Sequence, residues 1–228
     1  MNRIKSFLPL LVLVALGIAL LASGALSRFD PHHIAREQEE LQAAIAAHPL
    51  SSALAHVGLM ALAIATGLPG AVVVVLAGGM LFGVVAGTAL SALGTTLGAL
   101  VLFLASRTAF AQGDTQVPAL VEKLRAGYQA HPVSYALFLR LVPFFPFGGI
   151  TVALAWLGCP LWLFLLATAS GGTVMVGFET ALGAGLTETI AREGTVSLNL
   201  FAHRSVVLPL LGMALLALAP ILLGRLRR

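Results

Sequence analysis

Long runs of apolar residues dominate this sequence and leave few environments in which it can fold. The runs are much longer than a typical strand, and apolar and polar positions do not alternate within them. Hydrophobic residues make up 59% of the chain and charged residues 10%, against about 25% charged in a soluble domain. Because backbone polar groups in lipid need partners within the chain, these runs predict an all-α integral membrane protein.

Four of the runs are long enough to cross a bilayer, which takes about 20 residues. They cover residues 7–26, 87–106, 160–181 and 206–223. The first run could be a cleaved signal peptide, since small residues occupy positions 22–25. Its long apolar core and the many later runs favour a retained anchor instead. We therefore expect about four full transmembrane helices.

Two further apolar segments are interrupted by proline and glycine. The first interruption is Gly67-Leu68-Pro69-Gly70, and the second runs from Pro143 to Gly149. Proline removes a backbone donor and glycine relaxes φ, so a helix should break at each place. Broken backbone at membrane depth is tolerated only inside protein or beside a water-filled cavity. The two segments therefore predict two re-entrant helical hairpins, the first over residues 52–85.

Basic residues gather at both ends of the chain. Arg3 and Lys5 precede the first run, and Arg225, Arg227 and Arg228 close the sequence. Because Lys and Arg favour the cytoplasmic side, both termini should be cytoplasmic and the number of complete spans even. Four spans satisfy this condition, and the hairpins then enter from opposite sides as an inverted repeat. We expect the inner (plasma) membrane of a bacterium and do not interpret the net charge of +4 as nucleic-acid binding.

The broken segments divide the chain into three parts. We expect residues 1–49 to form an N-terminal transmembrane anchor and an external amphipathic segment. Residues 50–185 form the core with both hairpins, and residues 186–228 form an external loop and the C-terminal transmembrane helix. Two polar stretches, 31–48 and 116–129, predict helices that lie at the membrane surface.

Three motifs in the core resemble a known family. They are Gly67-Leu68-Pro69-Gly70, Ala77-Gly78-Gly79-Met80-Leu81-Phe82-Gly83 and Arg140-Leu141-Val142-Pro143-Phe144-Phe145-Pro146-Phe147. In this order and spacing they resemble the DedA superfamily, and within it the branch called SNARE-associated Golgi protein or VTT domain, from about Gly67 to Gly185. The resemblance implies two re-entrant helices that meet in the membrane and a role in moving lipid between leaflets. It also implies a link to envelope integrity, and proton coupling has been proposed for bacterial members.

Arg140 is the sharpest candidate for contact with a transported molecule. An ionisable group inside an apolar segment is costly and usually faces the protein interior or a cavity. Its guanidinium group suits a phosphate, and a lipid headgroup is a natural partner. The alternative is an anchor that snorkels to the interface, which is the stronger explanation for Arg107 at the end of a span. The predicted headgroup site comprises Arg140, Arg107, Pro143, Pro146, Gly67, Pro69 and Gly70.

Glu179 and His56 are the candidates for proton coupling. Glu179 lies toward the outer end of the third span, where a carboxylate could carry a proton or simply face water. His56 can titrate near neutral pH, although a single histidine on an apolar helix is more often packed and hydrogen-bonded. Both assignments therefore keep a simpler alternative.

Several classes of function find no support in the sequence. Cys159 is the only cysteine, no nucleophile–base set or metal cluster is visible, and no nucleotide-binding loop follows Gly67-Leu68-Pro69-Gly70. We expect no enzyme activity, no cofactor and no metal. The expected partner is a membrane lipid, and the protein could also form a homo-oligomer. The leading hypothesis is a lipid scramblase or flippase that supports envelope integrity. The alternatives are a proton-coupled transporter of a small anion or metal, and a structural membrane factor without transport.

Overall fold

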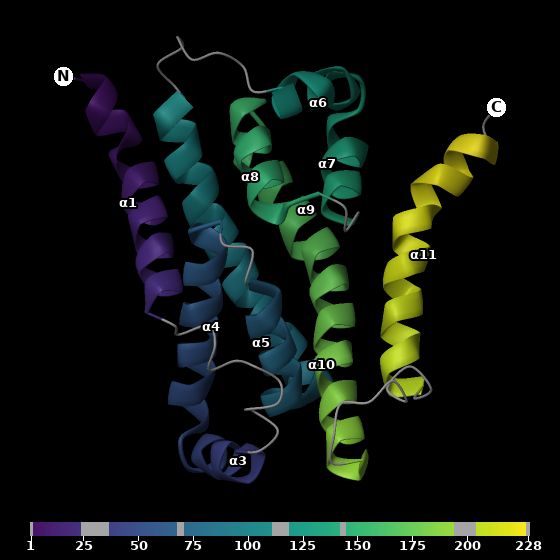
Figure 1. The fold of residues 1–228 in the computed structure, drawn as a ribbon. Helices are drawn as coiled ribbons and strands as arrows, with labels where there is room; N and C mark the ends of the chain where they lie inside the picture. Colours follow the sequence, from purple (N-terminus) through teal and green to yellow (C-terminus); the bar gives the residue numbers. More distant parts are fainter. Residues whose placement is uncertain are drawn as a thin grey trace.

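The computed structural model describes residues 2–23, 37–67, 71–110, 119–141, 145–193 and 204–226. These residues form helices and short turns and contain no strand, which confirms the expected all-α class. The helices, labelled in Figure 1, are α1 (Asn2–Ala22), α3 (Gln38–Ala47), α4 (Pro49–Ala65), α5 (Ala71–Phe110), α6 (Ala119–Ala130), α7 (Pro132–Leu141), α8 (Phe147–Trp156), α9 (Leu161–Ala167), a π-helix (Thr168–Gly172), α10 (Thr173–Glu193) and α11 (Arg204–Leu226).

Two helical stretches of the described chain are long and apolar enough to cross a bilayer by themselves. They are Ala71–Phe110 and Leu161–Thr187. A bent pair, Glu40–Ala47 with Pro49–Ala65, would make a third if its 110° bend lay within one span. Shorter apolar helices accompany them: Phe7–Ala19, Pro132–Leu141, Phe147–Trp156 and Arg204–Leu215. The apolar helices establish a membrane protein, and the total of four full spans stays a prediction.

The helix α5 is two helices joined by a sharp turn at Gly83. That residue has φ 74° and ψ −179°, which is not helical and which a residue with a Cβ adopts only with strain. The chain folds back at this turn and brings Gly87 against Gly78. A Cβ on Gly87 would lie only 2.6 Å from the carbonyl oxygen of Gly78. Residues 71–82 are called the first limb of α5 and residues 84–110 the second. With α4, the first limb forms a helical hairpin, which we call hairpin 1.

The helices α7 and α8 repeat this design from the other end of the molecule (Figure 1). Each has 10 residues, and residues 145 and 146, which precede α8, are not helical. Gly158, with φ 71°, closes this second hairpin and precedes the long α9–α10 helix, as Gly83 precedes the second limb of α5. Figure 1 shows hairpin 1 starting from the end of the molecule that carries α3, and hairpin 2 (α7 and α8) starting from the end that carries α6.

The two hairpins touch at their broken tips. A Cβ added to Gly148, at the start of α8, would lie 3.2 Å from the Cα atom of Gly67, which follows α4. Gly67 has φ 68°, so the backbone turns there in a conformation that favours glycine. The two predicted breaks, far apart in sequence, therefore lie side by side within the fold.

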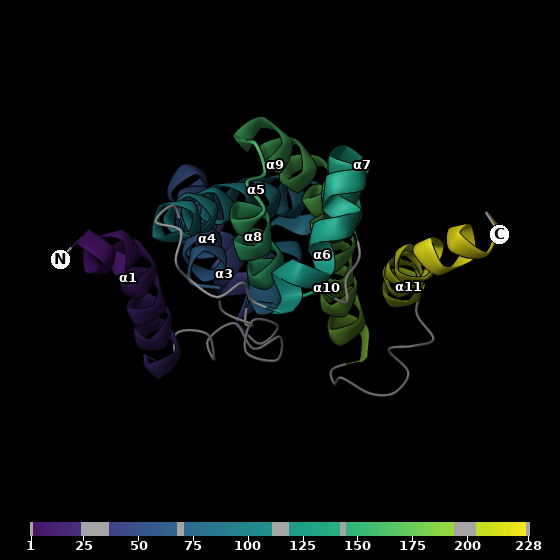
Figure 2. The same cartoon turned by 90° about the horizontal axis from the view of Figure 1, so that it is seen from above.

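Close backbone contacts hold the long helices against hairpin 1. A Cβ on Gly79 of the first limb would overlap the carbonyl oxygen of Thr180 in α10, and a Cβ on Gly183 would overlap that of Leu76. The hydroxyls of Thr88, on the second limb of α5, and Thr180 share a hydrogen bond of 2.6 Å, so α10 also contacts the second limb. Small residues allow helices to approach closely where no hydrophobic effect drives them together. Figure 2 shows α1 and α11 at opposite edges of the bundle built around this contact.

The structure extends or shortens some predicted elements. The helix α10 continues to Glu193, so the loop expected from residue 186 begins later; its Ala, Thr, Glu and Arg residues tolerate helix beyond the apolar run. The surface helices predicted over 31–48 and 116–129 are α3 (Gln38–Ala47) and α6 (Ala119–Ala130), and the remaining residues of 31–48 before position 37 lie outside the described chain. Both termini lie at the α6 end (Figure 1), as an even number of crossings requires.

Candidate functional site

Arg140 lies in the last turn of α7, next to the break of hairpin 2. Its side chain is only 4% exposed. One guanidinium nitrogen, Nη2, donates to Thr151 Oγ1 of α8 at 3.0 Å, and Nη1 donates to the carbonyl oxygen of Phe147 at 3.4 Å. Thr151 in turn donates to that same carbonyl at 2.9 Å. These bonds hold the guanidinium group between the two limbs of hairpin 2.

Aromatic rings provide most of the remaining surroundings of the cation. The guanidinium carbon lies 4.1 Å from the ring centre of Phe147 and 5.1 Å from that of Phe164 in α9. A cation attracts the negative face of an aromatic ring, and the attraction grows when both are desolvated. Phe164 also stacks on Phe103 of α5, with ring centres 4.1 Å apart, so these contacts join hairpin 2 to both long helices.

The charge of Arg140 is only partly compensated. Its Nε atom is buried and has no hydrogen-bond partner, and no carboxylate among the described residues forms an ion pair with it. Buried charges in proteins are normally paired, since leaving one unpaired costs several kcal/mol. A buried guanidinium with a free donor and no anion is therefore chemically suited to accept an anionic group.

Thr168 carries another buried hydroxyl without a partner, on the π-helix that follows α9, and it was not among the predicted site residues. Its hydroxyl is buried, at 1% exposure, and has no partner. It lies on the π-helix between Phe164, whose ring faces Arg140, and Gly171, where a Cβ would be 2.9 Å from the Cβ of Arg140. π-Helices are frequent at functional sites. The only feature of the sequence that could have indicated this site is a polar residue, Thr168, in an apolar run shortly before Gly171 and Gly172.

Two more buried hydroxyls lack partners, those of Thr95 and Ser106 on the second limb of α5. An unpaired hydroxyl costs about 1–3 kcal/mol by mutational measures, much less than an uncompensated charge. Arg140 is therefore the dominant feature of the site, and the hydroxyls are secondary.

Arg107 lies at the outer edge of the aromatic cluster around Arg140. Its side chain is exposed, and Nη1 donates to the carbonyl oxygen of Cys159, just after the turn at Gly158, at 3.3 Å. The guanidinium carbon lies 5.9 Å from the ring centre of Phe103. This placement ties the end of α5 to the end of hairpin 2 and is the geometry expected of an interfacial anchor.

The predicted break residues are only partly described. Gly67 lies at the contact between the two hairpin tips, and Pro146 precedes the first residue of α8 in an extended conformation, with φ −62° and ψ 120°. Pro69, Gly70 and Pro143 lie outside the described residues. The structure therefore brings Gly67 and the start of α8 together.

His56 is packed and hydrogen-bonded inside hairpin 1. Its Nε2 atom lies 2.8 Å from the hydroxyl oxygen of Ser91, and its ring centre lies 5.3 Å from that of Phe82. A Cβ on Gly78 would collide with the imidazole ring. The histidine joins α4 to the second limb of α5, in agreement with the simpler of its two interpretations.

Glu179 lies well inside the α9–α10 helix, because α10 continues to Glu193. Its side chain is half-buried and has no hydrogen-bond or ion-pair partner among the described residues. It does not contact Arg140 or His56, so the proton-coupling candidates do not form a cluster. The described part of the chain also holds no group of three or more His, Cys, Asp or Glu placed to bind a metal ion.

These features define a helical membrane protein built around two opposed, broken hairpins that meet at their tips. The profile of the VTT domain matches residues 68–185, slightly more than half of the chain. The protein therefore belongs to the VTT-domain family, also described as the DedA/SNARE-associated Golgi protein family. No curated protein and no solved structure matches the chain. The matched region covers residues 68–70 of the first break, α5, all of hairpin 2, α9 and α10 up to residue 185, and it leaves out α1, α3, α4 and α11.

Proposed function

We propose that this protein moves a membrane lipid between the two leaflets, and that Arg140 binds the phosphate of the lipid headgroup. The observation that supports the proposal is a buried guanidinium group beside the broken tips of the hairpins, with a free donor and no anionic partner among the residues that the structure describes. Arginine binds phosphate through several donors at once, and these charge-assisted bonds are stronger in a site with little water. Membership of a family to which membrane transport is commonly attributed agrees with this function.

We further propose four full crossings and two half-depth hairpins. The crossings would be α1, the second limb of α5, α9–α10 and α11. A helix of 10 residues is about 15 Å long, half of a hydrocarbon core of about 30 Å, so α7 and α8 would reach only the midplane. Arg107, Lys123 and Arg125 lie near the α6 end, which would be cytoplasmic together with both termini, in the inner membrane of a bacterium.

The hairpin tips would provide the polar passage. A headgroup leaving one leaflet would exchange water for the guanidinium of Arg140 and the hydroxyl of Thr168, while its acyl chains stay in lipid. Broken backbone is tolerated at this depth only where protein or water meets it, so the tips are the place where a headgroup can be accommodated. Passive exchange between leaflets needs no nucleotide or metal.

The direct test is a scrambling measurement in vesicles that contain a headgroup-labelled phospholipid. Wild-type protein should make the label on the inner leaflet accessible to an external quencher. Arg140→Ala should slow this by about 100-fold, the cost of losing one well-formed charged contact of about 3 kcal/mol. Arg125→Ala is the matched control, because Arg125 lies at the surface of α6, 3.6 Å from Glu122. Equal rates for protein-free vesicles and wild type would refute the proposal.

A second candidate function rests on Glu179. A half-buried carboxyl without a partner, in a helix that crosses the membrane, is typical of proton-coupled transporters of small anions or metals. A proton flux into vesicles that depends on a solute gradient, and that Glu179→Gln removes, would favour this function over passive lipid exchange.

A further inference from the structure

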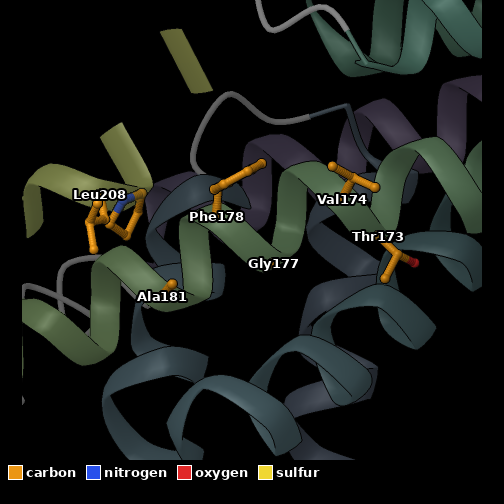
Figure 3. Close-up of a pocket in the computed structure, with 7 residues that line it drawn as sticks. Thr173, Val174, Gly177, Phe178, Ala181 and Leu208 are labelled. Carbon is orange, nitrogen blue, oxygen red and sulfur yellow. The ribbon is translucent and has the colours of Figure 1, made fainter. Parts of the chain in front are cut away.

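An apolar groove separates α10 from α11. It has a volume of about 400 Å³ and is lined by Val174, Phe178 and Ala181 of α10 and by Leu208 and Pro209 of α11 (Figure 3). The two helices approach closely at two places: Gly185 of α10 faces the backbone of Ser205, and Gly212 of α11 faces the ring of Phe178, where a Cβ would overlap the ring. The helix α11 lies outside the family match, so the groove is not a feature of the VTT domain alone.

The groove continues the helix face on which α7 packs. Gly171, where the Cβ of Arg140 is in contact, is followed on the same face by Val174, Phe178 and Ala181, at spacings of three and four residues. Figure 1 shows α7 ending at mid-height beside α9–α10, while α11 lies along α10 from there toward the α3 end. The groove therefore begins within one helical turn of Gly171, the residue that faces the Cβ of Arg140.

The size and the lining of the groove identify what fits in it. The lining residues Thr173 to Ala181 cover about 12 Å of α10. A helix of that length and about 10 Å across has a volume more than twice the 400 Å³ of the groove. The one polar lining side chain, Thr173, already donates its hydroxyl to the carbonyl oxygen of Ala169. Nothing in the lining needs a polar partner, as is expected of a site for a hydrocarbon chain.

The groove is also open to the surrounding lipid. Val174 is 42% exposed and Leu208 63% exposed at its edges, so a chain could enter sideways from the bilayer. We propose that the groove binds one acyl chain of the lipid whose phosphate is held at Arg140. This rests on the proposed function, and it assigns to α11 the role of selecting and guiding the tail. The occupant is thus a membrane phospholipid rather than a second protein chain.

The test uses the full-length protein in phosphatidylcholine vesicles that contain phosphatidylglycerol with a photoreactive group midway along one acyl chain. Irradiation should attach the lipid to α10 and α11 peptides that contain Phe178 and Leu208. Ala181→Phe, which fills the groove, should lower this labelling and the rate of lipid exchange by about tenfold. Val101→Phe is the control, since Val101 is 48% exposed on α5, away from the groove, and should change neither.

A second comparison links the tail to the headgroup. Arg140→Gln should lower groove labelling by the photoreactive phosphatidylglycerol and leave labelling by a diacylglycerol with the same photoreactive chain unchanged. Equal labelling of wild type and Ala181→Phe, or crosslinks from the groove to a second protein chain, would overturn the proposal. Groove labelling without any lipid exchange would keep the acyl-chain site and refute the proposed function instead.

Discussion

The two broken hairpins have the same outline but treat their buried polar groups differently. In hairpin 1, His56 is hydrogen-bonded to Ser91 at 2.8 Å, and glycines bring the backbones into direct contact. In hairpin 2, Arg140 keeps a buried donor without a partner and has no carboxylate beside it among the described residues. A paired polar side chain supports the fold, whereas a partly unpaired cation is what the proposed headgroup site requires. The proposal therefore assigns different roles to two hairpins of similar backbone geometry.

The largest change in stability is expected for a substitution in hairpin 1 that disturbs the packing of its backbone. Gly79→Ala would place a Cβ against the carbonyl oxygen of Thr180, and backbone on both sides cannot move cheaply. We expect a loss of about 3 kcal/mol in the free energy of unfolding, the upper range for overpacking. Thermal unfolding in detergent would measure it.

The control for this prediction is the same substitution where space is open. A Cβ on Gly58 of α4 meets nothing within 4 Å, so Gly58→Ala should stabilise the helix by about 0.5–1 kcal/mol. Similar melting temperatures for the two variants would show that the contact between α5 and α10 is looser than the structure indicates.

Arg140→Met is predicted to raise stability while it removes lipid exchange. Buried ion pairs replaced by apolar side chains often give a gain of about 1–4 kcal/mol. We expect a gain of this size from Met, because it removes the desolvation cost of a charge that no anion among the described residues compensates. Unfolding in detergent and exchange in vesicles would be measured on the same preparation. A variant less stable than wild type would mean that Arg140 serves the fold, and the contrast between the hairpins would disappear.

His56→Leu is predicted to change stability in the opposite direction. It leaves the buried hydroxyl of Ser91 without its partner and should destabilise the protein by about 1–2 kcal/mol. A double-mutant cycle with Ser91→Ala should give a coupling energy of about 1 kcal/mol. Additive effects would show that the two side chains do not support each other.

The smallest effect on stability is expected for Thr168→Val, which keeps the shape of the side chain and removes a hydroxyl that has no partner. The free energy of unfolding should change by less than about 1 kcal/mol, and phospholipid exchange should slow by about fivefold, as for one neutral hydrogen bond. Thr187→Val, in the same long helix, is the control and should leave exchange unchanged. An unaltered rate in Thr168→Val would remove the hydroxyl from the site.

Some of these features were visible in the sequence because they depend on local chemistry. Proline and glycine disrupt helices, so residues 67–70 and 143–149 indicated where the two breaks lie, and a charge in an apolar segment singled out Arg140. The second break is shorter than predicted, because Phe147 to Gly149 already form the first turn of α8. The turns at Gly83 and Gly158 could not be found in this way. The chain has 24 glycines, and only the structure shows which of them adopt a positive φ.

The sequence by itself determined that this protein lies in a membrane, that it is helical, and where its two helix breaks occur. These follow from how each short segment interacts with lipid and with its own backbone. Only the tertiary structure decided that the breaks meet at Gly67 and Gly148, that His56 is paired while Nε of Arg140 is not, and that α11 forms a groove with α10. Pairing and contact join residues far apart along the chain, and no local pattern records which partners the fold brings together.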